Sequence, residues 1–201
     1  MTVAVTGPFA SGKSTLVRLL GELPATETAS ADEIVHHLLK NDRRTISRII
    51  ERFGEEVRGA DGIDRKALGR KVFSDAEALR DLEEILHPLV QGETDRRIGA
   101  SRAQMFVVEI PLLFETGRGE DFDFTVAVTV PEARRRVWVE ERGVDEAALR
   151  AVETRQLSGG EKARRADLVV QNDGDLDKLE VQAHELGRRI SRERGSDGNL
   201  R

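Results

Sequence analysis

Eight residues near the start of the chain have the types and spacing of a phosphate-binding loop. The pattern G-x-x-x-x-G-K-[ST] is matched at every position by residues 7–14, GPFASGKS. In such a loop the backbone N–H groups point inward at phosphate oxygens, and Gly7 and Gly12 allow the backbone angles that this requires. The positive end of the helix predicted to follow would also favour an anion. We therefore predict that the chain binds nucleotide phosphates here.

The polar side chains of this loop suggest phosphoryl transfer. Lys13 would reach the β and γ phosphates of ATP, and Ser14 would place its hydroxyl on Mg²⁺. Glu109 ends an apolar run, where P-loop proteins commonly hold Mg²⁺ directly or through water, although it could instead cap a turn before Pro111. The predicted nucleotide-binding residues of the loop are Gly7, Phe9, Ala10, Ser11, Gly12, Lys13, Ser14 and Thr15.

Asp32 is the candidate for the group that orients or deprotonates the acceptor. It follows the second predicted strand, and ligands of open parallel sheets bind at the carboxyl ends of strands. An aspartate there could equally be the N-cap of a helix over residues 33–39. Arg142 lies in a later arginine-rich segment, and arginines that arrive on closure stabilise the charge of a transferring phosphoryl group. We predict Lys13, Asp32 and Arg142 as the catalytic residues.

The composition excludes several other kinds of chemistry. The chain has 201 residues, a net charge of −5 and no cysteine, which excludes disulfides, thiolate nucleophiles and cysteine-bound zinc. A net acidic chain argues against nucleic acid as a partner. The apolar start is too short for a signal peptide and no run is long enough to span a membrane. We expect a cytoplasmic protein without membrane or nucleic-acid partners, with a monomer favoured.

Short β-branched runs alternate with segments of helical spacing, which predicts βαβ units and an α/β fold. Most of these runs are apolar throughout, as in a parallel sheet covered on both faces. We expect a three-layer P-loop core of about five parallel strands, with helices at Lys13–Gly21 and at Ala76–Arg97, the latter broken near Pro88. The predicted strands are Thr2–Thr6, Met105–Ile110, Phe124–Val130, Leu168–Gln171 and, more weakly, Ala25–Ala29.

Two stretches are too long for simple crossovers and are predicted as helical insertions. Residues 32–102 would form an acceptor-binding insertion, and residues 131–165 a lid. The core would then comprise residues 1–31, 103–130 and 166–190, followed by a flexible polar tail over 191–201.

Four sequence blocks in order resemble the dephospho-CoA kinase family, from Val3 to about Leu186. After the phosphate loop come Asp61-Gly62-Ile63-Asp64-Arg65 with Ile85-Leu86-His87-Pro88-Leu89-Val90, then Glu109-Ile110-Pro111-Leu112-Leu113-Phe114-Glu115, then Gln156 with Ala166-Asp167 and Asn172-Asp173-Gly174. The chain departs from the family pattern in three places. Pro8 and Ala10 replace glycines, Ser30 replaces the first acid before Asp32, and Trp138 stands where a lid arginine is usual.

The resemblance implies ATP-dependent phosphorylation of the 3′-hydroxyl of dephospho-CoA, which yields coenzyme A and ADP with Mg²⁺ as cofactor. It implies that the Asn172–Gly174 loop packs beside the adenine, although these are also ordinary turn residues. Arg134, Arg135 or Arg136 would replace the missing lid arginine. The residues that the resemblance assigns to the acceptor are Asp32, Arg65, His87, Pro111 and Leu112, and those it assigns to the nucleotide loop are Asn172 and Gly174.

Three other interpretations are weighed against this one. Another small-molecule kinase, acting on a nucleoside monophosphate, shikimate or a sugar acid, would share the P-loop but not the block from Asp61 to Val90. A GTP-dependent switch would usually carry an N-K-x-D motif, which is absent. Residues 157–161, LSGGE, look like the signature of ATP-binding cassettes, but no strand ending in Asp-Glu follows them.

Overall fold

A computed structural model describes residues 1–73, 75–144 and 146–197 of the chain. The chain forms two compact units, the first comprising Met1–Ala29 with Ser101–Arg201 and the second Ser30–Ala100.

The first unit is built on a five-stranded sheet whose strand order is β2-β5-β1-β6-β7. The central strand β1 pairs in parallel with β5 and β6, and β6 pairs in parallel with β7. The parallel α/β core expected from the sequence is therefore confirmed. The strands are β1 (Thr2–Thr6), β2 (Thr26–Ser30), β5 (Met105–Glu109), β6 (Phe124–Thr129) and β7 (Leu168–Gln171).

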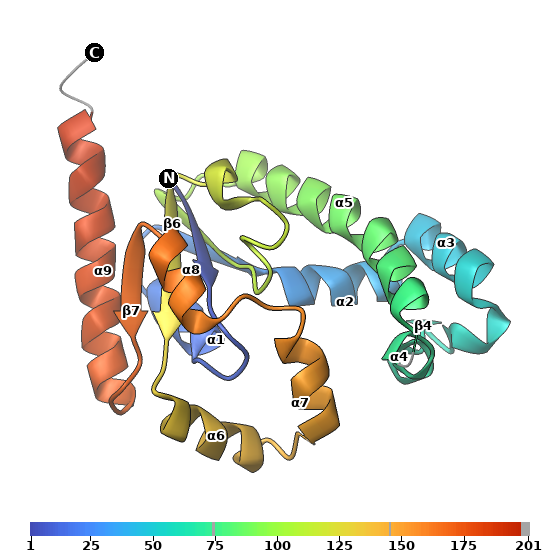
Figure 1. Ribbon diagram of the computed structural model, residues 1–201. Helices are drawn as coiled ribbons and strands as arrows, with labels where there is room; N and C mark the ends of the chain where they lie inside the picture. The colour runs from blue at the N-terminus through green and yellow to red at the C-terminus, as the bar shows by residue number, and fades with distance from the viewer. Residues whose placement is uncertain (74, 145, 198–201) are drawn as a thin grey trace. The chain divides into compact units, whose positions relative to one another are not determined.

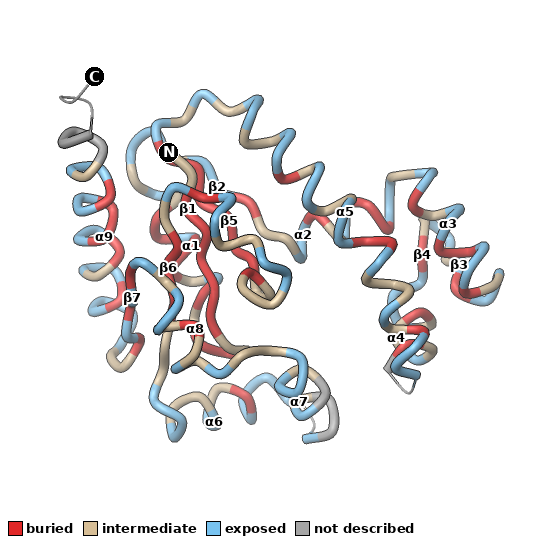
Figure 2. The backbone as a smooth tube through the Cα atoms, turned by 45° about the horizontal axis from the view of Figure 1, so that its top comes forward, coloured by how far each residue is buried: buried red, intermediate tan, exposed pale blue. Residues whose placement is uncertain are grey.

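The helices cover the sheet on both faces (Figure 1). Side chains alternate along a strand, so Val3 and Val5 point to one face and Ala4 and Thr6 to the other. On the first face they join a core with α1 (Lys13–Gly21) and α9 (Leu176–Asp197). On the other face α8 (Gly159–Arg165) packs on β6 and reaches Thr6. Figure 2 shows β1 and β6 buried along most of their length.

Two short helices occupy the segment predicted as a lid, α6 (Glu132–Glu141) and α7 (Glu146–Glu153). A 3₁₀ turn, Gly119–Asp121, precedes β6. Helix α9 continues to Asp197, past the predicted end of the core at residue 190; residues 198–201 of the predicted tail lie outside the described part. Among the described residues no helix has both the length and the apolar character needed to cross a membrane.

The second unit is mainly helical and has its own apolar core. Ile49, Val57, Leu68, Ile85 and Leu86 are all buried in it. Its elements are α2 (Ala31–Asn41), α3 (Arg43–Phe53), a 3₁₀ turn (Glu55–Val57), β3 (Arg58–Gly59), β4 (Gly62–Ile63), α4 (Arg65–Phe73) and α5 (Ala76–Ala100).

Two details of this unit correct the sequence prediction. Helix α5 is not broken near Pro88 but runs through it. Pro88 is exposed, so solvent can bond the carbonyl that loses its N–H partner, while the buried Ile85 and Leu86 one turn earlier keep the helix packed. The unit also contains an antiparallel pair, β3 with β4, which is too short to show strand periodicity in sequence.

Candidate active site

The loop between β1 and α1 has the tight backbone that its glycines predict. A side chain at Gly7 would place its Cβ 2.5 Å from the carbonyl oxygen of Val128. Gly12 has φ 91°, and a Cβ there would lie 2.2 Å from the amide nitrogen of Asn172. Both positions therefore exclude larger residues, and the loop can lie close to β6 and to the turn after β7.

Lys13 and Ser14 open α1 and place their polar groups at the carboxyl end of the sheet. The ammonium of Lys13 turns back over the loop and donates to the carbonyl of Pro8 at 2.9 Å. The hydroxyl of Ser14 donates to Glu109 Oε1 at 3.0 Å. Glu109 is the last residue of β5 and only 7% exposed. The structure thus brings together the three side chains that the sequence predicted for phosphate and metal binding.

Asn172 supports the loop from the other side. It follows β7, is buried, and its side-chain amide donates to the carbonyl of Ser11 at 3.0 Å. The sequence predicts the Asn172–Gly174 loop beside the adenine; in the structure the Asn172 amide contacts the P-loop backbone. Ala10, at the tip of the same loop, has φ 58°, a left-handed conformation that glycine adopts without strain. The substitution of Ala10 for the usual glycine has therefore kept the glycine-like backbone.

Phe9 is held by two residues from the lid segment. Its backbone N–H donates to Gln156 Oε1 at 3.1 Å. The guanidinium of Arg142, at the C-terminal end of α6, lies 5.8 Å from the centroid of the Phe9 ring. Sequence reasoning chose Arg142 but gave Gln156 no role, although Gln156 belongs to the fourth block of the family resemblance.

The three consecutive lid arginines have different surroundings. Arg134 donates to the carbonyl of Gly174 and lies 5.8 Å from the Trp138 ring centroid. Arg135 forms ion pairs with Glu132 at 3.0 Å and Glu153 at 2.5 Å, which ties α6 to α7. The hydrogen bonds that Arg135 donates to the Glu132 carboxylate raise the already high pKa of Arg135 further.

Arg136 is 74% exposed and contacts only Glu132 among the described residues. Within the described part of the chain, Arg134 is therefore the one of the three that contacts a residue the sequence assigned to the nucleotide site.

Pro111 and Leu112 begin the loop after β5. The carbonyl of Pro111 accepts a hydrogen bond from Thr6 Oγ1 at 3.3 Å, which joins this loop to the residue before the P-loop. The carbonyl of Leu112 accepts the Thr116 hydroxyl at 2.8 Å. Both side chains are half-buried at the carboxyl end of the sheet.

The other residues predicted for the acceptor belong to the second unit. Asp32 lies in the first turn of α2 and is exposed; Ser30 occupies the N-cap position, so the alternative of Asp32 as the cap is wrong. Arg65 begins α4, with Nη1 3.2 Å from His36 Nδ1. Partial burial lowers the pKa of His87, which favours its neutral form.

The segment that resembles a cassette signature is the start of a helix. Ser158 is the N-cap of α8, and its hydroxyl oxygen accepts the N–H of Glu161 at 3.1 Å. Gly159 lies against Pro8 of the P-loop, where an added Cβ would be 3.4 Å from the proline ring. Local helix capping and close packing therefore account for these residues.

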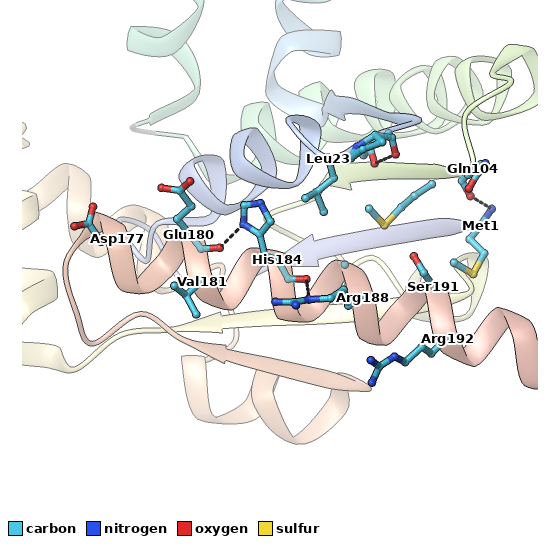
Figure 3. A pocket seen from close by; sticks show the side chains of 14 residues that line it. Met1, Leu23, Gln104, Asp177, Glu180, Val181, His184, Arg188, Ser191 and Arg192 are labelled. Atoms are coloured by element: carbon cyan, nitrogen blue, oxygen red, sulfur yellow. Dashed lines mark hydrogen bonds between the residues drawn. The ribbon is translucent and has the colours of Figure 1, made fainter.

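A groove of the first unit lies away from the P-loop (Figure 3). It is lined by Met1, Met105 and Thr26 at the amino ends of β1, β5 and β2, and by Leu23 and His184. In a parallel sheet these ends form the edge opposite the P-loop. Among the described residues that line it, none was predicted for the site, so we do not assign the reaction to this groove.

The fold and the site together define a class of protein. A glycine-rich loop joins the central parallel strand to a helix, a lysine lies over that loop, and an acid and a hydroxyl meet beside it. These are the parts of a P-loop phosphotransferase.

Comparisons with known proteins identify the family within this class. The profile of the dephospho-CoA kinase family matches residues 1–178. A dephospho-CoA kinase of Methylococcus capsulatus is 36% identical over 193 residues, which cover 95% of this chain and 97% of that protein.

Two solved structures agree with this result. TT1252 from Thermus thermophilus is 31% identical with a TM-score of 0.79, covering 94% of this chain and 97% of that one. A dephospho-CoA kinase from Campylobacter jejuni is 26% identical with a TM-score of 0.70, covering 96% and 98%. The chain belongs to the dephospho-CoA kinase family, an ATP-dependent kinase family, which confirms the resemblance seen in the sequence.

Proposed function

We propose that the protein transfers the γ-phosphoryl group of ATP to the ribose 3′-hydroxyl of dephospho-CoA and releases coenzyme A and ADP. The family match supports this acceptor over a nucleoside monophosphate, shikimate or a sugar acid. The observation that carries the chemistry is the convergence of Lys13, Ser14 and Glu109 beside the loop.

The loop offers groups that suit a bound phosphate. The Ser11 hydroxyl is buried and, within the part of the chain that is described, has no hydrogen-bond partner. A buried hydroxyl without a partner is rare in proteins and is expected where a ligand completes the hydrogen bond. Lys13 is only 7% exposed, so its charge acts through little water.

The residues present also fit Mg²⁺. Ser14 and Glu109 present a hydroxyl and a carboxylate 3.0 Å apart, and hard oxygen ligands of this kind suit the ion. The described residues contain no cluster of three acidic, histidine or cysteine side chains, and Mg²⁺ in kinases is typically bound by one or two protein oxygens together with substrate phosphates. When bound, the ion would neutralise charge on the β and γ phosphates.

The chain's own residues then have distinct parts in the transfer. The acceptor oxygen forms a bond to the γ phosphorus as the bond to the β–γ bridging oxygen breaks, and Asp32 orients the acceptor hydroxyl or takes its proton. Lys13 and Arg142 stabilise negative charge on the transferring group. Arg65, His87, Pro111 and Leu112 bind the acceptor, and the Asn172–Gly174 loop contacts the nucleotide.

The test is coupled ADP release by the purified protein with a panel of acceptors. We expect turnover with dephospho-CoA that requires Mg²⁺ and is negligible with nucleoside monophosphates or shikimate. Preference for one of those acceptors would contradict the proposed substrate. Tight GTP binding with negligible acceptor-dependent turnover would instead favour a nucleotide switch.

We also propose that the enzyme acts in the cytoplasm as a monomer and needs no nucleic-acid or membrane partner. The acidic net charge of −5 supports the absence of a nucleic-acid partner. A mass measured by light scattering at assay concentration tests the monomer.

A further inference from the structure

One charged side chain of the first unit is fully buried and has no part in the proposed reaction. Lys162 of α8 is 0% exposed. Its ammonium donates to the carbonyl of Pro111 at 2.7 Å and to Glu115 Oε2 at 3.0 Å, and it lies 2.7 Å from Glu115 Oε1. A longer contact of 3.3 Å reaches the hydroxyl of Thr6. The ammonium thus has polar contacts with three different residues.

The partners of Lys162 lie next to the site. Thr6 is the residue before the first glycine of the P-loop, and Pro111 begins the loop after the strand that ends in Glu109. Glu115 lies four residues further along that loop and is 15% exposed. The cation therefore bonds to the segments that lead out of β1 and β5 at their carboxyl ends.

Glu115 continues the network into the lid segment. Its Oε1 accepts the backbone N–H of Leu157 at 2.7 Å. Leu157 follows Gln156, whose side chain accepts the N–H of Phe9 in the P-loop at 3.1 Å. The chain of contacts runs from Lys162 through Glu115 and the backbone at 157 to Gln156 and back to the P-loop.

Stability alone does not explain a buried ion pair between Lys162 and Glu115. Bringing an ammonium and a carboxylate out of water costs much of what their attraction returns, and apolar residues of similar size are often as stable or more so. Burial lowers the pKa of Lys162, although the bond to Glu115 opposes this effect. What the pair provides is a fixed geometry of three loops.

We propose that Lys162 and Glu115 are positioning residues for phosphoryl transfer. They hold Gln156 and the loop at Pro111 in register with the P-loop, and neither touches the substrates. The proposal rests on the proposed function, because it takes the P-loop as the place of reaction. In a reaction that depends on positioning, a displacement of about 1 Å can cost about 100-fold in rate.

The experiment separates rate from stability. It uses the full chain with three variants, Lys162→Met, Glu115→Met and the double variant, and measures kcat at saturating ATP and dephospho-CoA together with the urea midpoint of unfolding. Each single variant leaves a buried charge without its partner, so both should have a lower midpoint and a kcat reduced about 10- to 100-fold. The double variant should have a higher midpoint than either single variant, because no buried charge is left unpaired, while kcat stays low.

A purely structural pair would give a different result. If the double variant recovers kcat together with the midpoint, the proposal is wrong. A matched control is Arg165→Met on the same helix, where an exposed arginine pairs with Glu161; this variant should keep the wild-type kcat.

A second measurement covers the case in which the double variant does not fold. Gln156→Leu leaves the buried pair intact and removes the hydrogen bond from the Phe9 N–H, the one side-chain bond of Gln156 among the described residues. It should lower kcat about 10-fold with an unchanged midpoint, and a wild-type kcat would overturn the proposal. Turnover of the wild type with the panel of acceptors is measured first. If the wild type prefers another acceptor, kcat of every variant is measured with that acceptor. An error in the proposed substrate then does not count against the proposal for Lys162 and Glu115.

Discussion

The side-chain amide of Asn172 donates a hydrogen bond to the backbone carbonyl of Ser11, with both groups buried and 3.0 Å apart. A residue from the last strand's end thereby holds the backbone of a loop 161 residues earlier in the chain. The same amide nitrogen lies where a Cβ of Gly12 would have to be. The P-loop conformation thus depends on the turn after β7 as well as on its own glycines.

Replacing Asn172 with alanine should weaken both the fold and nucleotide use. The Ser11 carbonyl would lose its partner in a buried place, which typically costs about 1–3 kcal/mol. The loop would also lose a fixed contact, so the KM for ATP should rise. Urea unfolding and ADP release measure the two effects.

The control for this variant is Gln171→Ala, one residue earlier and exposed. It should change the free energy of unfolding by no more than about 0.5 kcal/mol. Equal stability of the Asn172 and Gln171 variants would show that the bond to Ser11 is unimportant.

Much of the fold can be predicted from local sequence, because the parallel strands are continuous apolar runs. Two strands have the bounds that were predicted, Thr2–Thr6 and Leu168–Gln171. The P-loop can be recognised in the sequence because its function requires the glycines and the lysine at fixed spacing. The helix through Pro88 and the β3–β4 pair were not predicted, because packing and a two-residue pairing leave no periodic signal.

Less of the site than of the fold can be predicted from sequence, because several of its contacts join distant residues and leave no local pattern. Lys13, Ser14 and Glu109 were predicted because each follows a recognisable strand or motif, and the structure brings them together. The contacts of Gln156 and Lys162 join residues up to 156 positions apart in the chain. A single sequence does not indicate such pairs, since a glutamine or lysine on a polar helix normally faces solvent.

Lys13→Met should abolish most of the turnover and leave the fold nearly intact. Methionine keeps much of the volume of the buried side chain but removes the charge that would stabilise the transferring phosphates. We expect kcat to fall by at least about 100-fold. The assay is ADP release at saturating substrates, with Arg18→Met on the exposed side of the same helix as the control. A Lys13→Met enzyme with normal turnover would contradict the mechanism.

Ala10 offers a test of the loop's backbone. Its φ of 58° costs an alanine roughly 1–2 kcal/mol, whereas glycine adopts it freely but loses about 0.4–1 kcal/mol through its more flexible unfolded chain. Ala10→Gly should therefore leave stability unchanged or raise it by up to about 1.5 kcal/mol. Ala10→Val, β-branched and in a buried position, should destabilise by about 1–3 kcal/mol. A valine variant as stable as the glycine variant would mean that the loop is not held in this conformation.

Glu93 on α5 predicts a specific loss of stability in acid. Hydrogen bonds from Arg96 and Arg97 lower its pKa to about 2. Because the folded pKa lies below the unfolded value of about 4.5, the stabilisation is complete above pH 4.5 and is lost as the pH falls towards 2. Glu93→Gln should thus lower the free energy of unfolding by about 1–2 kcal/mol at pH 7, after allowance for solvent screening.

The difference between the Glu93→Gln variant and wild type should shrink steadily from pH 4.5 to pH 2.5 in urea titrations. Glu84→Gln, an exposed residue of the same helix, is the control and should differ little from wild type at either pH. If the difference in the free energy of unfolding between Glu93→Gln and wild type stays constant across this range, the ionised Glu93 and its arginine partners are not the cause of that difference.

Two arginines of the lid segment provide a matched pair, Arg136 within α6 and Arg142 at its C-terminal end. Arg142 lies over the Phe9 ring of the P-loop, at 5.8 Å from the centroid, while Arg136 is 74% exposed and contacts Glu132. If Arg142 stabilises charge on the transferring group, Arg142→Ala should lower kcat about 10- to 100-fold with little change in the free energy of unfolding. Arg136→Ala should lower kcat less than about twofold. Each variant removes one positive charge from α6 or its end. A general electrostatic effect would therefore reduce kcat equally in both variants. An equal reduction would exclude a specific role for Arg142.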